Sequence, residues 1–594
     1  MSNQYPLTWD LDSIYPGGSS SKVFSAELEE IATNIGKLTT LLDKKNRPSL
    51  ELVKELTGLA QRVLIALRQS ESFTSCLMAA NVKDQAAAAL SDRVNTLSAD
   101  YMSAMAQYDD ILRNIGDNEW EAMLADPELG AVAFYLNERR ELAKIKLTPE
   151  MEALIGDLSI DGYHGWGYFY NTIVAQAQFK AVEKSGESVL LSAGQMFNRL
   201  SDSDREVRKT AFQEWEREWA RNADLCADVL NRIAGFRLKL YQRRGWEQVL
   251  QEPLQINRMS EKTLSAMWEA VKEGQKLLQP YFQRKAELFG LERLDWHDVA
   301  APVNTSERII PFAEGADFIL EQFREFDPRL ADFSEKAFKE GWIEAEDRPG
   351  KRPGGFCTSL PKSQQTRIFM TYSGTMDNLS TLAHELGHAY HQHVMDDLPP
   401  FAHEYAMNVA ETASTFAEII VTDRALKASK DKDETISLLE SKIGNAVAFY
   451  SNIYARFLFE TRFYEARKQG LVSTEALNAL MEEAQREAFG GALGELHPHF
   501  WAAKLHFYLT DVPFYNFPYT FGYLFSAGLY ARANQEGEAF RDKYVALLRD
   551  TGSLTVEELA DKHLGINLEE PQFWKEAVAL TADDVALFLE LTKK

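Results

Sequence analysis

The chain has little cysteine and a shortage of positive charge, and each of these excludes a class of protein. Its 594 residues include three cysteines, Cys76, Cys226 and Cys357, which lie far apart and form no Cys-x-x-Cys pair. This spacing excludes a disulfide framework and favours a reducing compartment. Lys and Arg number 64 against 89 Asp and Glu, which gives a net charge of −25. A surface this acidic repels nucleic acid and anionic lipid, so neither is an expected partner.

Long hydrophobic runs are also absent. No stretch of about 18 apolar residues occurs, which excludes a membrane-spanning helix. The first eleven residues have neither a basic nor an apolar segment, so we expect no signal peptide. A cytoplasmic location follows by elimination. The composition, 45% hydrophobic and 26% charged, is typical of a folded globular protein rather than a disordered one.

Most of the chain has the apolar spacing of amphipathic helices. Between residues 49 and 115 apolar side chains recur three and four apart, which predicts several long helices. One of the predicted helix faces carries Tyr101, Met105, Tyr108 and Leu112. A weaker boundary follows at 126–148, where Pro127 and Gly130 interrupt the pattern.

Two short segments favour strands. Residues 177–182 and 188–191 flank a Ser185-Gly186-Glu187 turn, which predicts a β-hairpin. After a segment rich in Gly and Pro, residues 366–372 have the pattern of a strand. We therefore expect a small sheet inside a helical protein, and an extended peptide could pair with the edge of strand 366–372.

The strongest chemical signal is the sequence His-Glu-Leu-Gly-His at 384–388. On a helix, His384 and His388 lie one turn apart on one face, so both imidazoles can bind the same metal ion. Glu385 stands beside the first ligand, where it can hold a metal-bound water. Asp377 or Ser380 can cap the start of this helix. The alternative is a histidine-rich helix surface that binds no metal.

A catalytic zinc ion needs a third protein ligand and one open position. The next predicted helix carries Glu404, Glu411 and Glu418, which are seven apart and share a face. Periodicity alone does not choose among them, and a solvated acidic stripe is the alternative. The apolar neighbours of the last two favour a partnered carboxylate. We expect His391 and His393 to be supporting or surface groups rather than ligands.

His-Glu-Leu-Gly-His followed by Asn408-Val-Ala-Glu411-Thr-Ala-Ser resembles the M3 family of zinc metallopeptidases. The oligoendopeptidase F branch of that family is the nearer match, because distant segments agree with it as well. These weaker matches are Trp9-Asp10-Leu11, the stretch at 350–356, His506-Phe-Tyr508 and Gly522-Tyr523. The likeness therefore touches the chain from end to end.

The resemblance implies one Zn²⁺ per chain, held by His384, His388 and Glu411. It implies Glu385 as the catalytic base and Glu418 as a group that supports the ligands from behind. The family often has Pro where this chain has Ala413, which does not touch a ligand.

The C-terminal segment is crowded with histidines and aromatic residues, and an aromatic core is one reading of it. The resemblance instead implies that a histidine and tyrosines of this segment bind the substrate backbone and stabilise the oxyanion. His506 and Tyr523 match best, with His506 or Tyr523 at the oxyanion and Tyr515 and Tyr519 binding substrate. These tyrosines are four apart, an alignment that is partly lost if Pro518 begins or interrupts a helix. Thr520 stands at one position where the family has tyrosine.

For the fold, the resemblance implies a mainly α protein, a two-lobed helical ellipsoid with a deep substrate channel and a small β-sheet near the zinc helix. It implies an N-terminal helical region at 1–110, an oligopeptidase F-type helical region with a hairpin at 111–192, and a zinc metallopeptidase catalytic region at 193–594.

The expected function is hydrolysis of internal peptide bonds in short unfolded oligopeptides by a metal-activated water. One alternative is a carboxypeptidase or dipeptidyl carboxypeptidase on a similar helical scaffold. A second is a peptide-binding or metal-holding protein without activity, although the intact set of His384, Glu385 and His388 argues against it. We expect a monomer or a small homo-oligomer.

Overall fold

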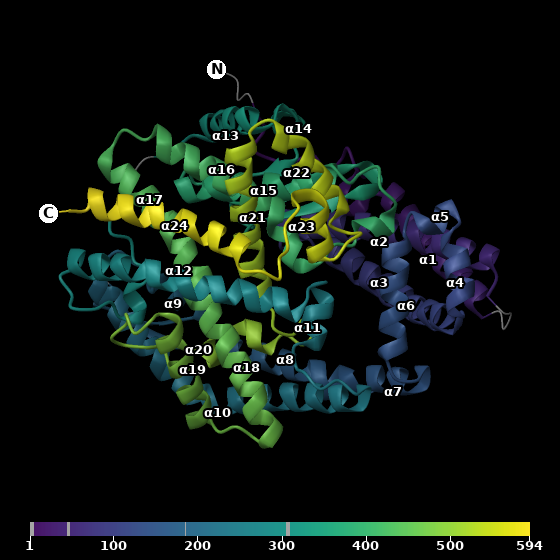
Figure 1. The fold of residues 1–594 in the computed structure, drawn as a ribbon, viewed down its shortest axis with the longest axis horizontal. Coiled ribbons are helices and arrows are strands. Elements are labelled where there is room, and N and C mark those ends of the chain that lie inside the picture. The colour runs from purple at the N-terminus through teal and green to yellow at the C-terminus, as the bar shows by residue number, and fades with distance from the viewer. Residues whose placement is uncertain (1–4, 44–47, 184–185, 305–308, 594) are drawn as a thin grey trace. The chain divides into compact units, whose positions relative to one another are not determined.

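The computed structural model describes residues 5–43, 48–183, 186–304 and 309–593. The chain forms two compact units, each assembled from three separate stretches. Figure 1 labels the helices and colours the chain by residue number. Unit 1 comprises Met1–Lys146, Arg308–Arg424 and Arg532–Gly565, and unit 2 comprises Leu147–Glu307, Ala425–Ala531 and Ile566–Lys594. The division of the sequence into regions at 1–110, 111–192 and 193–594 remains a hypothesis.

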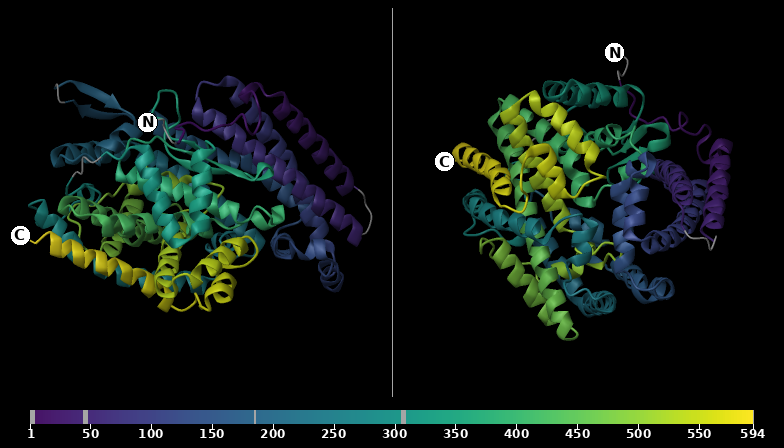
Figure 2. Two further views of the ribbon diagram at one scale, coloured as in Figure 1. Left: turned by 90° about the horizontal axis from the view of Figure 1, so that it is seen from above. Right: turned by 45° about the vertical axis from the view of Figure 1, so that its right-hand side comes forward.

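Unit 1 begins with three long helices that pack against one another (Figure 2). They are α1 (Lys22–Leu42), α2 (Leu50–Ala80) and α3 (Gln85–Asn114). The predicted apolar face of α3 is confirmed, because all four of its residues are buried in the core shared by these helices. The helical pattern is interrupted near Pro127, as predicted, but for fewer residues than the predicted range of 126–148, because α5 (Pro127–Gly130) and α6 (Ala133–Ile145) lie within that range. Proline there occupies the first position of a helix, where its missing N–H group is no loss.

The other helices of unit 1 lie between and after these. They are α4 (Asp117–Leu124), α5 (Pro127–Gly130), α6 (Ala133–Ile145), α13 (Phe312–Phe326), α14 (Pro328–Lys339), α15 (Met376–His393), α16 (Met407–Ala428), α22 (Ala539–Asp550) and α23 (Val556–Leu564). The last four residues of α16 belong to unit 2.

A three-stranded sheet in unit 1 packs against α15. Its strands are β3 (Ile343–Glu344), β4 (Phe356–Leu360) and β5 (Gln365–Phe369), in the order β3-β5-β4. β5 is parallel to β3 and antiparallel to β4, with Phe356 opposite Phe369. The prediction of a sheet beside the histidine helix is confirmed. The prediction that strand 366–372 offers an edge to a peptide is wrong, because β5 is the central strand and β4 lies at the edge.

Unit 2 contains the predicted hairpin and a second set of helices. The hairpin strands are β1 (Phe179–Val182) and β2 (Ser188–Leu191), with Phe179 opposite Leu191. Gly186 of the predicted turn has a φ of +87°, and Ser185 lies outside the described residues. The helices are α7 (Pro149–Ser159), α8 (Gly165–Gln176), α9 (Ala193–Arg199), α10 (Arg205–Arg244), α11 (Gln251–Ile256), α12 (Glu261–Leu288), α17 (Lys432–Val447), α18 (Ile453–Gln469), α19 (Thr474–Ala488), α20 (Phe500–Ala503), α21 (Phe517–Glu536) and α24 (Gln572–Leu591).

Helices make up 72% of the chain, and the two sheets are small, which confirms the mainly α class. Among the described residues, no helix combines the length and the apolar character needed to cross a membrane.

Candidate active site and metal centre

The helix that carries the His-Glu-Leu-Gly-His sequence begins at Met376, at least two residues earlier than either predicted cap allows. Thr375 caps α15, and its Oγ1 accepts the N–H of Asn378 at 3.1 Å. The predicted caps Asp377 and Ser380 are wrong, since both residues lie inside the helix. A hydroxyl at the cap position satisfies one of the N–H groups that the first turn leaves without a partner.

Gly387 lets α15 and α16 approach closely. A Cβ atom at this position would lie 2.4 Å from the carbonyl oxygen of Ala413 and 2.6 Å from Cα of Ser414. No larger residue fits without moving one helix. The close crossing brings Glu411 of α16 beside the two histidines of α15.

The structure brings His384, His388 and Glu411 together. Oε2 of Glu411 lies 3.3 Å from Nε2 of His384 and 3.5 Å from Nε2 of His388. The imidazole centres are 4.9 Å apart, and their planes are nearly perpendicular. All three side chains keep about a quarter of their surface exposed, which leaves solvent access to the atoms they share.

These distances fit a metal ion better than they fit hydrogen bonds. A tetrahedral zinc ion 2.0–2.2 Å from each ligand atom holds two of them about 3.3–3.6 Å apart. A charged imidazole–carboxylate hydrogen bond is normally shorter, about 2.7–2.9 Å. One carboxylate oxygen at 3.3 and 3.5 Å from two imidazole nitrogens therefore has the spacing of a shared ion.

The three glutamates that periodicity could not separate have different partners. Glu418 accepts the Nδ1–H of His384 at 3.2 Å, on the far side of the ring from Glu411. Glu404 precedes α16 and forms an ion pair with Arg68 instead. A carboxylate on Nδ1 fixes the tautomer that presents the Nε2 lone pair to a metal.

The electrostatic surroundings of these residues favour a cation. Burial alone would raise the pKa of Glu411, but its close contacts with His384 and His388 hold that pKa well below the usual range. Burial alone would lower the pKa of His384, but Glu411 and Glu418 together raise it to about 10. Positive charge is therefore stabilised between these side chains.

Glu385 is buried beside the edge strand, with 7% of its surface exposed. The backbone N–H of Cys357 in β4 donates to its carboxylate, and a Cβ atom on Gly355 would lie 3.7 Å from its Oε1. Burial raises the pKa of Glu385, and the two neighbouring histidines oppose that rise. A carboxylate with a raised pKa is better able to take a proton from water and return it.

The remaining histidines of α15 do not join the metal group. His391 is fully buried, where its Nε2 contacts the Leu548 carbonyl at 3.2 Å and Oγ1 of Thr551 at 2.9 Å. Burial lowers the pKa of His391 to about 3, so it is a neutral packing residue. His393 is half exposed and pairs with Asp396.

The C-terminal candidates lie in unit 2, where His506, Tyr515 and Tyr519 form a cluster. The His506 ring centre is 4.9 Å from that of Tyr515 and 6.5 Å from that of Tyr519, and the Tyr519 hydroxyl donates to the Tyr515 hydroxyl at 3.1 Å. Pro518 stands in the first turn of α21, so the helix is not interrupted and Tyr519 and Tyr523 keep their common face.

Tyr523 stacks on Phe449, with ring centres 4.5 Å apart. Thr520 is buried and donates to the Phe449 carbonyl at 3.1 Å.

The partners of His506 determine its tautomer. Asn516 Oδ1 lies 2.7 Å from His506 Nδ1 and also accepts from Nη1 of Arg456 at 3.0 Å. Because the arginine can only donate, Oδ1 is an acceptor. Nη1 of Arg456 also lies 3.4 Å from Nδ1 of His506, but the 2.7 Å contact with Oδ1 is much shorter, so we assign the proton to Nδ1 of the histidine. Burial lowers the pKa of His506 to about 4, so it is neutral at pH 7 and its Nε2 carries a lone pair.

Sequence reasoning missed several residues that hold these groups. Oγ of Ser414 donates to Oε2 of Glu411 at 2.9 Å, and its position three residues later on the same helix is the signal that could have revealed it. Arg456 and Asn516 are 60 residues apart, and no local pattern connects them. A pocket of about 940 Å³ in unit 2, lined partly by Trp246 and Arg467, contains none of the site residues.

The sequence pattern of peptidase family M3 matches residues 198–580, which is more than half of the chain. The chain belongs to peptidase family M3. The pattern named Oligopeptidase F matches residues 112–179. This M3 chain is therefore a metallopeptidase, and its family implies a bound metal ion and peptide substrates. The group of His384, His388 and Glu411 fits such an ion.

Two relatives of known family align with this chain over nearly its whole length. An oligoendopeptidase F homolog from Lactococcus lactis subsp. lactis (strain IL1403) is 25% identical over 99% of this chain and 98% of its own length. Oligopeptidase PepF from Bacillus subtilis (strain 168) is 21% identical over 95% of this chain and 84% of its own.

Two solved structures share the fold. A crystal structure from Chlamydophila abortus has a TM-score of 0.87 at 20% identity, over 100% of this chain and 99% of its own. Oligoendopeptidase-F from Enterococcus faecium has a TM-score of 0.72 at 17% identity, over 96% of this chain and 99% of its own.

Proposed function

We propose that this M3 metallopeptidase is a zinc-dependent endopeptidase that hydrolyses internal bonds of short unfolded oligopeptides. The observation that carries the proposal is the convergence of His384, His388 and Glu411 on one point with ligand-like spacing. Two imidazole nitrogens and one carboxylate oxygen are a ligand set of catalytic zinc sites, although cobalt or manganese can occupy similar ligands. We propose one Zn²⁺ per chain.

When bound, zinc would supply a Lewis acid that lowers the pKa of a water molecule and polarises the scissile carbonyl. Glu385 would accept the proton of that water on its carboxylate and then deliver it to the leaving amine. The Cys357 N–H holds this carboxylate in place, and burial keeps its pKa raised for the task. Glu418 would keep His384 in the tautomer that a ligand requires.

We assign His506 to binding the peptide backbone rather than to the oxyanion. With the proton on Nδ1, its Nε2 accepts a hydrogen bond, and a peptide N–H is the donor that a substrate backbone offers. An oxyanion needs a donor, so we propose the hydroxyl of Tyr523 for that role. A positioned donor of this kind contributes about 3 kcal/mol to a transition state. Tyr515 and Tyr519 would bind the substrate.

We propose that an extended substrate pairs with β4, the edge strand of the sheet beside α15. Edge pairing binds the peptide main chain through hydrogen bonds that do not depend on sequence. This mode favours unfolded peptides over folded proteins.

The test of the base is Glu385→Gln, assayed with an internally quenched peptide. We expect zinc content to be unchanged and turnover to fall by a factor of about 10³ or more, since the variant cannot take up the proton. Unchanged turnover with zinc still bound would disprove the assignment. Peptides amidated at the C-terminus distinguish the alternatives, because a carboxypeptidase or dipeptidyl carboxypeptidase should not cut them.

We also propose a cytoplasmic location and a monomer or small homo-oligomer. The three cysteines are all free, as a reducing compartment favours. Active enzyme recovered only from an oxidising compartment would contradict this.

A further inference from the structure

Unit 2 contains a second group of side chains with the chemistry of metal ligands. One ligand atom from each of Asp295, His297 and Glu495 lies within 4.8 Å of the other two. The group shares no residue with the candidate active site in unit 1. Two of its members belong to a turn of 3₁₀ helix at Trp296–Asp298 and to its cap, and the third follows α19.

The two chain segments that carry these residues are held together by backbone contacts. Gly494 donates its N–H to the Leu294 carbonyl at 2.8 Å, and Trp296 donates to the Glu495 carbonyl at 2.9 Å. The N–H of Glu495 donates to Oδ1 of Asp295 at 2.8 Å. The fold therefore fixes the two backbone segments and the Asp295 carboxylate, which supplies part of the preorganisation that a metal site requires.

His297 is buried without satisfying either ring nitrogen. Its side chain is 0% exposed, and neither Nδ1 nor Nε2 has a hydrogen-bond partner among the described residues. The nearest carboxylate contact is Oδ1 of Asp298, 3.8 Å from Nε2 and beyond hydrogen-bond reach. Leaving such a buried group without a partner destabilises the folded state. A metal ion bound through one nitrogen would supply a partner.

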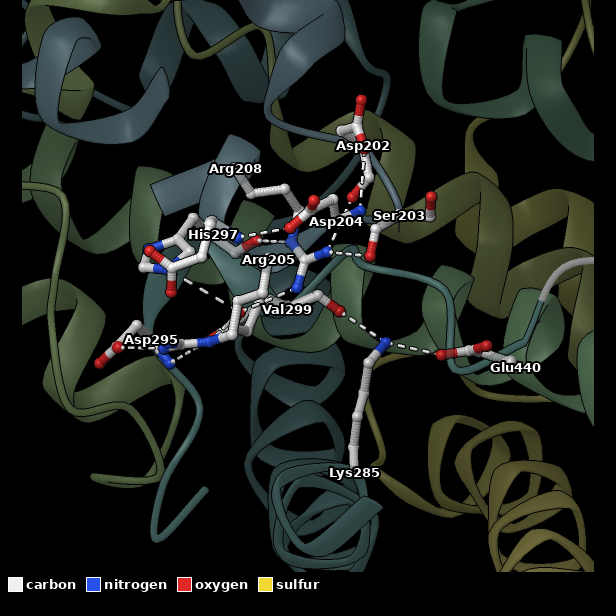
Figure 3. Close-up of polar contacts among 12 residues, drawn as sticks. Asp202, Ser203, Asp204, Arg205, Arg208, Lys285, Asp295, His297, Val299 and Glu440 are labelled. Carbon is white, nitrogen blue, oxygen red and sulfur yellow. Dashed lines mark hydrogen bonds and ion pairs between the residues drawn. The ribbon is translucent and has the colours of Figure 1, made fainter. Parts of the chain in front are cut away.

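The charged residues around the group leave the carboxylates of Asp295 and Glu495 able to bind a metal ion. Asp298 is neutralised by Arg208 at 3.1 Å and Arg205 at 3.0 Å. Figure 3 shows both arginines together with Asp295 and His297. Arg205 also reaches Oδ2 of Asp295 at 2.8 Å, but each carboxylate oxygen has two lone pairs. Glu495 is exposed and has no ion-pair partner in the described part of the chain.

We propose that Asp295, His297 and Glu495 bind a second divalent transition-metal ion. One nitrogen and two carboxylate oxygens suit zinc or manganese better than calcium or magnesium, which prefer oxygen alone. The ion would cross-link two segments that are 200 residues apart in sequence and would stabilise unit 2 without taking part in peptide hydrolysis. This site does not depend on the function proposed for unit 1.

The experiment uses the full chain with His384→Ala and His388→Ala, which removes the ligands of the first site. After dialysis against Zn²⁺ and then metal-free buffer, we expect mass spectrometry to find one zinc per chain. Adding Glu495→Gln should weaken zinc binding about tenfold or more in a chelator competition. Glu495 is exposed, so this variant should fold. Glu292→Gln, at an exposed carboxylate near the same turn, is the matched control and should bind zinc normally.

A second measurement is the thermal unfolding midpoint with and without added Zn²⁺. We expect zinc to raise the midpoint of the His384→Ala/His388→Ala protein and to raise it less after Glu495→Gln, because a ligand that binds the folded state stabilises it. No zinc bound to the folded double variant would overturn the proposal. Zinc binding that is equally strong with Gln at position 495 would overturn it as well.

Discussion

The carboxylate of Glu418 lies 3.2 Å from Nδ1 of His384, on the opposite side of the imidazole from Glu411. The ring is thus held between two carboxylates, one at each nitrogen. On the Glu411 side lies a second imidazole, that of His388, whose Nε2 is 3.5 Å from the same carboxylate oxygen. The arrangement separates the proposed ligand from the residue that orients it.

Glu418→Gln should weaken metal binding because a neutral amide holds the His384 ring less firmly. Loss of such a supporting group typically costs 10–100-fold in metal affinity, and we expect about that range here. Zinc affinity by chelator competition measures it. Glu404→Gln is the control, since Glu404 pairs with Arg68 and should not change the affinity. Equal zinc affinity in wild type and Glu418→Gln would contradict the supporting role.

Gly387→Ala should separate α15 from α16. The added methyl group would lie 2.4 Å from the Ala413 carbonyl, so we expect about 1–3 kcal/mol of destabilisation together with weaker metal binding. Gly36→Ala in α1 is the matched control, because nothing lies within 4 Å of its added methyl. That control should be stabilising by about 0.5–1 kcal/mol. Denaturant unfolding compares the two, and similar effects would disprove the close-crossing argument.

Glu460 provides a test of pH-dependent stability in unit 2. It is buried in α18, its Oε1 accepts the Phe514 N–H at 3.2 Å, and burial raises its pKa to about 8, against the opposing charge of Arg237. The pKa in the folded protein lies above the ordinary value of 4.5 for a glutamate. The carboxyl therefore contributes stability that is complete below about pH 4.5 and is lost as pH rises through 8.

Glu460→Gln keeps the acceptor but cannot ionise. We expect the melting temperature of the variant, relative to wild type, to rise between about pH 5 and pH 8 and then to level off. Circular dichroism at several pH values measures this. A difference in melting temperature that does not change with pH would show that Glu460 does not titrate in this range.

Asn516→Ala should disturb His506 without touching the metal. The ring would lose its 2.7 Å hydrogen bond. We expect kcat/KM to fall about tenfold, because that factor corresponds to the free energy of roughly one such hydrogen bond. Zinc content should not change. Asn478→Ala is the control, because Asn478 contacts His499 instead. If both variants lowered kcat/KM equally, the effect would be structural rather than specific to His506.

The sequence alone could predict the metal pair but not its third partner. Helical periodicity places His384 and His388 on one face, whereas Glu404, Glu411 and Glu418 satisfy the same period. Only the crossing of α15 and α16 at Gly387 distinguishes them, and that crossing is a property of packing. From the sequence, only the family resemblance indicated Glu411 as the third ligand.

Other features depend on contacts between distant segments. The central position of β5 depends on which strands pair with it, and a strand pattern carries no such information. The Asn516–Arg456 contact at His506 and the grouping of Asp295 with Glu495 join residues 60 and 200 positions apart. By contrast, the buried face of α3 and the hairpin at 179–191 are local patterns, and both were predicted.

The most direct test of the central claim is anomalous diffraction at the zinc absorption edge from crystals of the active enzyme. We predict a peak about 2.0–2.2 Å from Nε2 of His384, Nε2 of His388 and Oε2 of Glu411. A fully active crystal form with no anomalous peak within reach of these three atoms would contradict the account.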